Sequence, residues 1–92
     1  MIISDTQSIK VLSHCVAAEY SGGVAILDTK NNEFFVLNDV GKIVWDCISI
    51  GKNIDEAVFL ILQEYEVDEG QVRADVASVL NDLAKNGLIE RD

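Results

Sequence analysis

The chain has 92 residues, of which 49% are hydrophobic and 25% charged, and its formal net charge is −9. This length and composition predict one soluble globular domain with a modest core, spanning residues 1–92. The acidity argues against a nucleic-acid partner, because clustered Lys and Arg side chains supply most of the affinity for phosphates. Two interpretations of the charge remain, namely solubility or a basic or neutral peptide partner.

The cysteine content and the hydropathy of the chain argue against further classes of protein. The two cysteines, Cys15 and Cys47, are too few for a disulfide scaffold and lack the spacing of metal ligands. No apolar run approaches the ~20 residues of a membrane span, and the N-terminus lacks a signal-type apolar segment. We therefore expect a cytoplasmic protein with free thiols, no membrane association, no metal and no cofactor.

The first third of the chain is β-like. Three runs rich in β-branched or apolar residues are predicted as strands: Val11 to Ala18, Val24 to Asp28 and Glu33 to Leu37. Ser21-Gly22-Gly23 is predicted as a turn, and Asn31-Asn32 tolerates the left-handed geometry of a hairpin connection. Residues 1–8 show no period and are expected to be a frayed terminus.

The rest of the chain predicts three helices, each with a capping residue before an apolar stripe. Asn38, Asn53 and Asp68 are the predicted N-caps, and Glu56 completes a capping box with Asn53. The apolar stripes are Val40, Ile43, Val44, Cys47 and Ile48; Ile54, Ala57, Val58, Ile61, Leu62 and Tyr65; and Val72, Val76, Val79, Leu80 and Leu83.

Two glycines are expected to end helices. Gly51 follows the first helix, and Gly87 is a stop signal of the Schellman type after the third. Leu88-Ile89 is expected to fold back onto the core, and Glu90 to Asp92 to be a polar tail. The predicted fold is therefore α+β, a three-stranded antiparallel meander followed by three helices, in the order βββααα.

No catalytic constellation stands out, so the chain is predicted not to be an enzyme. His14 is the only histidine, and the predicted strand would place it and Cys15 on opposite faces. Cys47 lies on an apolar helical stripe and is expected to behave as a small hydrophobe. Gly41 lies early in a helix, where it either allows a close approach of another backbone or is merely tolerated.

The strand Glu33–Leu37 is the candidate for function, because a meander that ends at this strand leaves it at a sheet edge. Phe35 and Leu37 point to one face and Phe34 and Val36 to the other, so both faces are apolar. Either helices cover both faces, or one face lines a groove for a partner peptide. A peptide beside the last helix would meet apolar and charged groups there.

Several runs resemble the signature of the PqqD-like family, and the resemblance covers roughly Gly23 to Ile89. The runs are Leu27-Asp28, Glu33-Phe34-Phe35-Val36-Leu37-Asn38-Asp39-Val40-Gly41, Val44-Trp45, Asn53-Ile54-Asp55-Glu56-Ala57, Tyr65-Glu66-Val67-Asp68, Arg73-Ala74-Asp75-Val76 and Asn86-Gly87-Leu88-Ile89. Within the family, the chain is most similar to the stand-alone leader-binding proteins of lasso-peptide biosynthesis. The proline-glutamate-arginine segment of the pyrroloquinoline-quinone pathway member has no counterpart here.

This resemblance implies a winged-helix-like fold and a role as a recognition element for ribosomally synthesised, post-translationally modified peptides. It implies that the leader of a precursor peptide pairs with the edge strand and enters a groove against the third helix, for delivery to a leader peptidase. The implied site residues are Glu33, Phe34, Phe35, Val36, Leu37, Arg73, Val76, Ala77 and Leu80. The alternatives are a general protein interaction module and a winged-helix DNA-binding regulator. An acidic carrier protein is disfavoured by the β-like first third.

Overall fold

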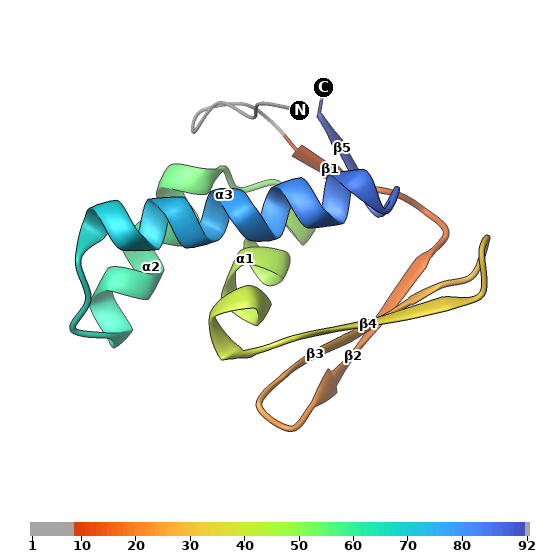
Figure 1. Ribbon diagram of the computed structural model, residues 1–92, viewed down its shortest axis with the longest axis horizontal. Helices are drawn as coiled ribbons and strands as arrows, with labels where there is room; N and C mark the ends of the chain where they lie inside the picture. The colour runs from red at the N-terminus through yellow and green to blue at the C-terminus, as the bar shows by residue number, and fades with distance from the viewer. Residues whose placement is uncertain (1–8, 92) are drawn as a thin grey trace.

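The computed structural model describes residues 9–91, so the expectation of a frayed terminus at residues 1–8 lies outside the described residues. Its elements in chain order are β1 (Ile9–Val11), β2 (Cys15–Tyr20), β3 (Gly23–Asp28), β4 (Glu33–Leu37), α1 (Asp39–Ser49), α2 (Ile54–Glu64), α3 (Glu69–Lys85) and β5 (Ile89–Arg91). Figure 1 shows the three-stranded sheet on one side of the molecule and α2 on the other, with α1 between them and α3 running across the molecule from the side of α2.

Strands β2, β3 and β4 form an antiparallel sheet with β3 in the middle. Three helices follow, which confirms the predicted α+β class and the βββααα order. Within the described residues, β4 pairs with a strand on one side only, so its other side is an open edge. The prediction that this strand lies at an edge is confirmed.

The predicted single strand from Val11 to Ala18 is wrong, because a turn at residues 12–14 divides it into β1 and β2. Strand β1 pairs instead with β5 in a separate two-stranded sheet. The chain end supplies the missing backbone partners, since Leu88 and Ile89 fold back into the core as expected. Glu90, predicted to belong to a polar tail, is part of β5.

Gly22 and Gly23, which the sequence predicted to share one turn, have different roles in the structure. Ser21 and Gly22 adopt positive φ values of 52° and 84°, which places the turn at these two residues. Gly23 is already the first residue of β3, and a Cβ there would overlap the carbonyl oxygen of Leu37. Gly23 is therefore needed for the close packing of β3 against the end of β4.

The predicted helix signals are confirmed. Asn38 Oδ1 accepts from the Gly41 amide at 2.8 Å, and the capping box at Asn53 is formed in both directions. Gly87 has a φ of 76°, and the amide of the next residue donates to the Leu83 carbonyl at 3.0 Å, as in a Schellman motif. These local bonds satisfy backbone groups that the helix ends would otherwise leave unpaired.

Gly41 has a packing role. It is buried in the first turn of α1, and a Cβ at this position would lie 2.8 Å from Cβ of Leu37. Contacts this short require a neighbouring group to move. The structure therefore favours close packing over mere tolerance, with the side chain of Leu37 as the close neighbour.

The core lies between one face of the β2–β3–β4 sheet and the three helices. Buried side chains from the sheet include Val24 and Ile26, and Phe35 and Leu37 pack against them from β4. The helices contribute Val44, Trp45, Ile48, Ile54, Val58, Ile61, Val72, Val76, Leu80 and Leu83. We call the sheet face that packs on this core the inner face, and the opposite one the outer face.

Asp28, which belongs to one of the runs that resemble the family signature, is a buried acid on the inner face. Its Oδ1 accepts from the backbone amides of Lys30 and Asn31 at 3.0 and 3.1 Å, and its Oδ2 accepts from Asn31 Nδ2 at 2.9 Å. The side-chain bond from Asn31, followed by the backbone bonds, outweighs burial and lowers the pKa of Asp28. Asp28 therefore anchors the turn that leads into β4.

We expect Asp28→Asn to lower the melting temperature at pH 7, because the amide cannot accept all three bonds. The wild-type carboxylate has a lowered folded-state pKa, so its stabilisation is present above the unfolded value of about 3.9 and is lost as pH falls. The difference between the two proteins should therefore shrink from pH 6 to pH 3, as measured by thermal denaturation. Asp75→Asn, at an exposed site on α3, is the control. An equal difference at both pH values would contradict this role for Asp28.

Candidate functional site

The two faces of β4 differ in exposure. On the outer face, Phe34 is 63% exposed and Val36 is 53% exposed, whereas Phe35 and Leu37 are half-buried against the core. The interpretation that helices cover both faces is therefore wrong. Among residues 9–91, β4 thus presents both a backbone edge without a paired strand and exposed apolar side chains.

A hollow of about 250 Å³ lies between the inner side of this edge and the C-terminal half of α3. It is lined by Phe35, Val36, Leu37, Val79, Asp82, Leu83 and Asn86. We call this hollow the β4–α3 groove. Five of its seven residues are apolar, and Asp82 is its one charged residue. A bound segment would meet apolar walls, one carboxylate and one amide.

Of the implied strand residues, Phe35, Val36 and Leu37 line this groove, whereas Glu33 and Phe34 do not. None of the implied helix residues lines it. Val76 and Leu80 are fully buried in the core, and Ala77 is exposed but does not line the groove. Arg73 lies near α2, where it pairs with Asp55 at 2.8 Å and is close to Phe59. The residues of α3 that line the groove lie further along the helix, at Val79, Asp82 and Leu83, and the C-cap Asn86 joins them.

The sequence contained part of the signal for these positions. Val79 and Leu83 belong to the predicted apolar stripe of α3, and the structure leaves Val79 only partly covered. Helical periodicity identifies the face that packs inward, but it does not say which end of that face lies beside a distant strand. Asp82 and Asn86 lie off the stripe, and no sequence pattern marked them.

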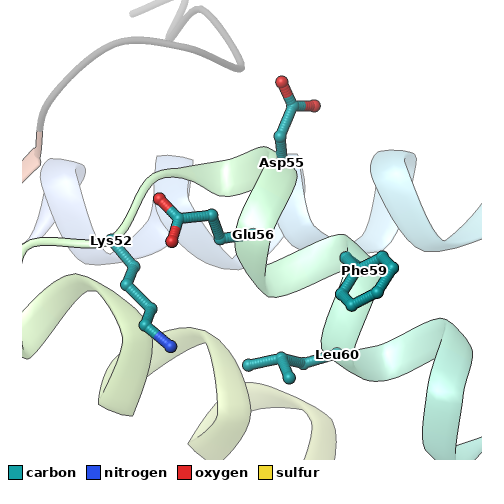
Figure 2. Close-up of a pocket in the computed structure, with 5 residues that line it drawn as sticks. All are labelled: Lys52, Asp55, Glu56, Phe59 and Leu60. Atoms are coloured by element: carbon teal, nitrogen blue, oxygen red, sulfur yellow. The ribbon is translucent and has the colours of Figure 1, made fainter.

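A second hollow, of about 330 Å³, lies over α2 and is lined by Lys52, Asp55, Glu56, Phe59 and Leu60 (Figure 2). Its acidic residues have structural partners. Glu56 accepts from the Asn53 amide in the capping box at 3.2 Å, and Asp55 pairs with an arginine of α3. This hollow is remote from the β4 edge, because α2 lies on the opposite side of the molecule from the sheet (Figure 1).

His14, Cys15 and Asp28 form the one described cluster that brings histidine, cysteine and aspartate together. His14 lies in the turn before β2, not within a strand as predicted, and its Nε2 is 3.6 Å from Asp28 Oδ1. Burial, followed by the charge of Asp28, raises the pKa of the Cys15 thiol. A reactive cysteine needs a lowered pKa, so this environment opposes nucleophilic catalysis.

Within residues 9–91, no group of His, Cys, Asp and Glu side chains is arranged to hold a metal ion. Both cysteines are free thiols, and Cys47 is buried as predicted. Among the described helices, none is long and apolar enough to cross a membrane.

A comparison with known protein families matches the part of the chain that contains β4 and α3. The family model for coenzyme PQQ synthesis protein D (PqqD) matches residues 23–89, which run from the start of β3 to the start of β5. A comparison with curated proteins gives no match.

Two solved structures share the fold. The first, described as TbiB1 in complex with the TbiA(beta) leader peptide, is 32% identical with a TM-score of 0.81. The alignment covers 88% of this chain and 94% of that one. The second, lasso peptide synthetase B1 complexed with the leader peptide, is 22% identical with a TM-score of 0.81. That alignment covers 90% of this chain and 98% of the other, and at this identity it shows the fold alone.

The family match covers most of the chain, and it includes the edge strand and the helix that together form the groove. The resemblance seen in the sequence is therefore confirmed. This chain belongs to the PqqD family.

Proposed function

We propose that this protein binds the leader segment of a ribosomally synthesised precursor peptide. The observation that carries the proposal is the β4–α3 groove, which lies directly beside a strand edge that no other described strand pairs with. A relative that is 32% identical is described in complex with a leader peptide, which supports the same role here. Main-chain pairing with the edge would supply affinity, and the groove would select side chains.

The proposed complex adds the leader as a fourth strand beside β4. Because side chains alternate along a strand, every second leader residue would enter the groove and the others would point to the outer face. Apolar anchors fit the walls formed by Val79 and Leu83, and a basic or hydrogen-bond-donating group fits beside Asp82. Each buried anchor contributes roughly 1.5–3 kcal/mol, less the cost of ordering the free leader.

The protein itself would do no chemistry in this proposal. It would hold the leader close to a processing enzyme, of which a lasso-pathway leader peptidase is our specific candidate, and so raise the effective concentration of substrate. The net charge of −9 disfavours DNA as the ligand. Helix α3 is itself acidic at Glu69, Asp75 and Asp82, and Arg73 is engaged by Glu69 at 3.0 Å.

The test is an amide-resolved NMR titration with the leader of the precursor peptide encoded nearest this gene. We expect shifts concentrated in Glu33–Leu37 and Val79–Asn86, with micromolar or tighter affinity. Amide exchange along β4 should slow, because its outward backbone groups become paired. A scrambled leader of the same composition is the control. Saturating leader that produced no shifts in β4 would contradict the proposal.

A further inference from the structure

The carboxylate of Asp82 differs from the other acidic side chains of α3. Glu69 accepts from Arg73 Nε at 3.0 Å, and Asp75 accepts from Gln71 Nε2 at 2.9 Å. Among residues 9–91, the Asp82 carboxylate has neither a hydrogen bond nor an ion pair. It is also the one acid of α3 that lines the β4–α3 groove. Its charge is therefore available to a ligand in the groove.

Helix stability does not explain an acid at this position. Asp82 lies in the last turn of α3, where the helix dipole favours basic side chains and disfavours acidic ones. Lys85 is the basic residue of this turn. The fold by itself therefore gives no reason for a carboxylate here, whereas a cationic group of a bound peptide does.

A second polar acceptor lies one helical turn beyond Asp82. Asn86 also lines the groove, and its Nδ2 donates to the backbone carbonyl of Asp82 at 2.8 Å. The other end of the same amide, Oδ1, is an acceptor. Positions four residues apart lie about 6 Å apart along a helix. A guanidinium group has five N–H donors in one plane and suits two such acceptors better than a compact ammonium group does.

The neighbouring wall of the groove is apolar. Val79 precedes Asp82 and Asn86, at about 4.5 and 10.5 Å from them along the helix axis. A leader strand beside β4 repeats its inward side chains about every 6.7 Å. Figure 1 shows α3 and β4 both running along the long axis of the molecule, so these spacings are comparable. Two successive inward side chains of the leader therefore match the Val79 wall and the two polar residues beyond it.

We propose that Asp82 and Asn86 form a specificity subsite for a basic side chain of the leader, two positions from an apolar anchor that packs on Val79. The inference rests on the proposed leader binding and names the chemistry of the peptide that the groove accepts. Backbone pairing with β4 holds any extended peptide, whereas this subsite distinguishes leaders by charge. An acidic side chain at the same leader position is rejected, because it would face the Asp82 carboxylate.

The competing explanation is a general attraction between basic peptides and a protein with a net charge of −9. Two matched variants separate the explanations, because Asp75→Asn changes the net charge as much as Asp82→Asn does, on the same helix but outside the groove. With the leader of the precursor peptide encoded nearest this gene, Asp82→Asn should raise Kd about 10-fold, since a charge-assisted hydrogen bond is lost. Asp75→Asn should stay within about 2-fold of wild type. Calorimetric titration measures both.

A double-mutant cycle identifies the leader residue that occupies the subsite. Each Lys or Arg of the leader is replaced by Gln in turn. One replacement should raise Kd about 10-fold with the wild-type protein but less than about 2-fold with Asp82→Asn. The other replacements should act equally on both proteins. At the identified position, a leader with arginine should bind about 3-fold more tightly than a leader with lysine.

Charge reversal tests the same contact in the opposite direction. Asp82→Arg should weaken binding of the natural leader at least ~30-fold, and Glu at the identified leader position should restore Kd to within about 5-fold. Both Asp82 variants should melt at or above the wild-type temperature, because they remove an acid from the last turn of a helix. A lower melting temperature together with the loss of affinity would assign Asp82 a structural role and overturn the proposal.

The outcomes distinguish this inference from the proposed function. Equal Kd values for Asp82→Asn and Asp75→Asn would overturn the subsite while leaving leader binding intact. A bound leader without any basic residue would do the same, as would a cycle in which no replacement couples to Asp82. A wild-type protein that bound no leader would contradict the proposed function and this inference together.

Discussion

Val79→Asp should abolish leader binding, with a rise of at least ~100-fold in Kd. Val79 lines the β4–α3 groove from α3 and is only half-buried, so its side chain is available to a ligand. The substitution removes an apolar contact worth about 1.5 kcal/mol and places a carboxylate against an apolar anchor. A loss of about 2.7 kcal/mol corresponds to the expected 100-fold change. Fluorescence anisotropy with a labelled leader measures it.

Ala77→Asp is the matched control for this prediction. It adds the same charge to the same helix, at an exposed residue outside the groove, and should change Kd by less than about 3-fold. Val79→Thr keeps the shape of the side chain and should weaken binding by roughly 10-fold without unfolding the protein. If Ala77→Asp weakened binding as much as Val79→Asp, the ligand would lie over the part of α3 that the family resemblance implied.

Leu80→Ala should destabilise the fold, and it should do so without a specific effect on the leader. Leu80 has no exposed surface and packs in the core from α3. Truncation of such a leucine costs about 2–5 kcal/mol, a large share of the ~5–15 kcal/mol of a domain this size. We expect the melting temperature to fall by about 10 °C or more.

Urea denaturation and leader binding together separate these effects. Leu60→Ala, at a partly exposed leucine of α2, is the control and should cost less than about 1.5 kcal/mol. At a temperature where Leu80→Ala remains folded, its Kd for the leader should stay within about 3-fold of wild type. A large loss of leader affinity in a fully folded Leu80→Ala variant would contradict this prediction and would support Leu80 as a residue of the binding site.

The elements that depend on neighbouring residues could be predicted from the amino-acid sequence. Asn38, Asn53 and Asp68 cap their helices as predicted, because a capping side chain bonds to amides within three residues. The strand Glu33–Leu37 and the end of the third helix at Gly87 were also predicted correctly, since their geometry is set within a few residues. The family resemblance rests on the same local runs, in the same order.

Which of these elements contact one another depends on the packing of the whole chain. The first predicted strand was divided because Ile89–Arg91, more than seventy residues away, pair with β1, and the Leu88 carbonyl accepts from the Leu12 amide that follows it. Strand alternation gave the two faces of β4, but burial on one side alone was settled by where the helices pack. The groove combines β4 with the end of α3 for the same reason. Local chemistry fixes the period of an element, whereas its neighbours depend on how the whole core closes.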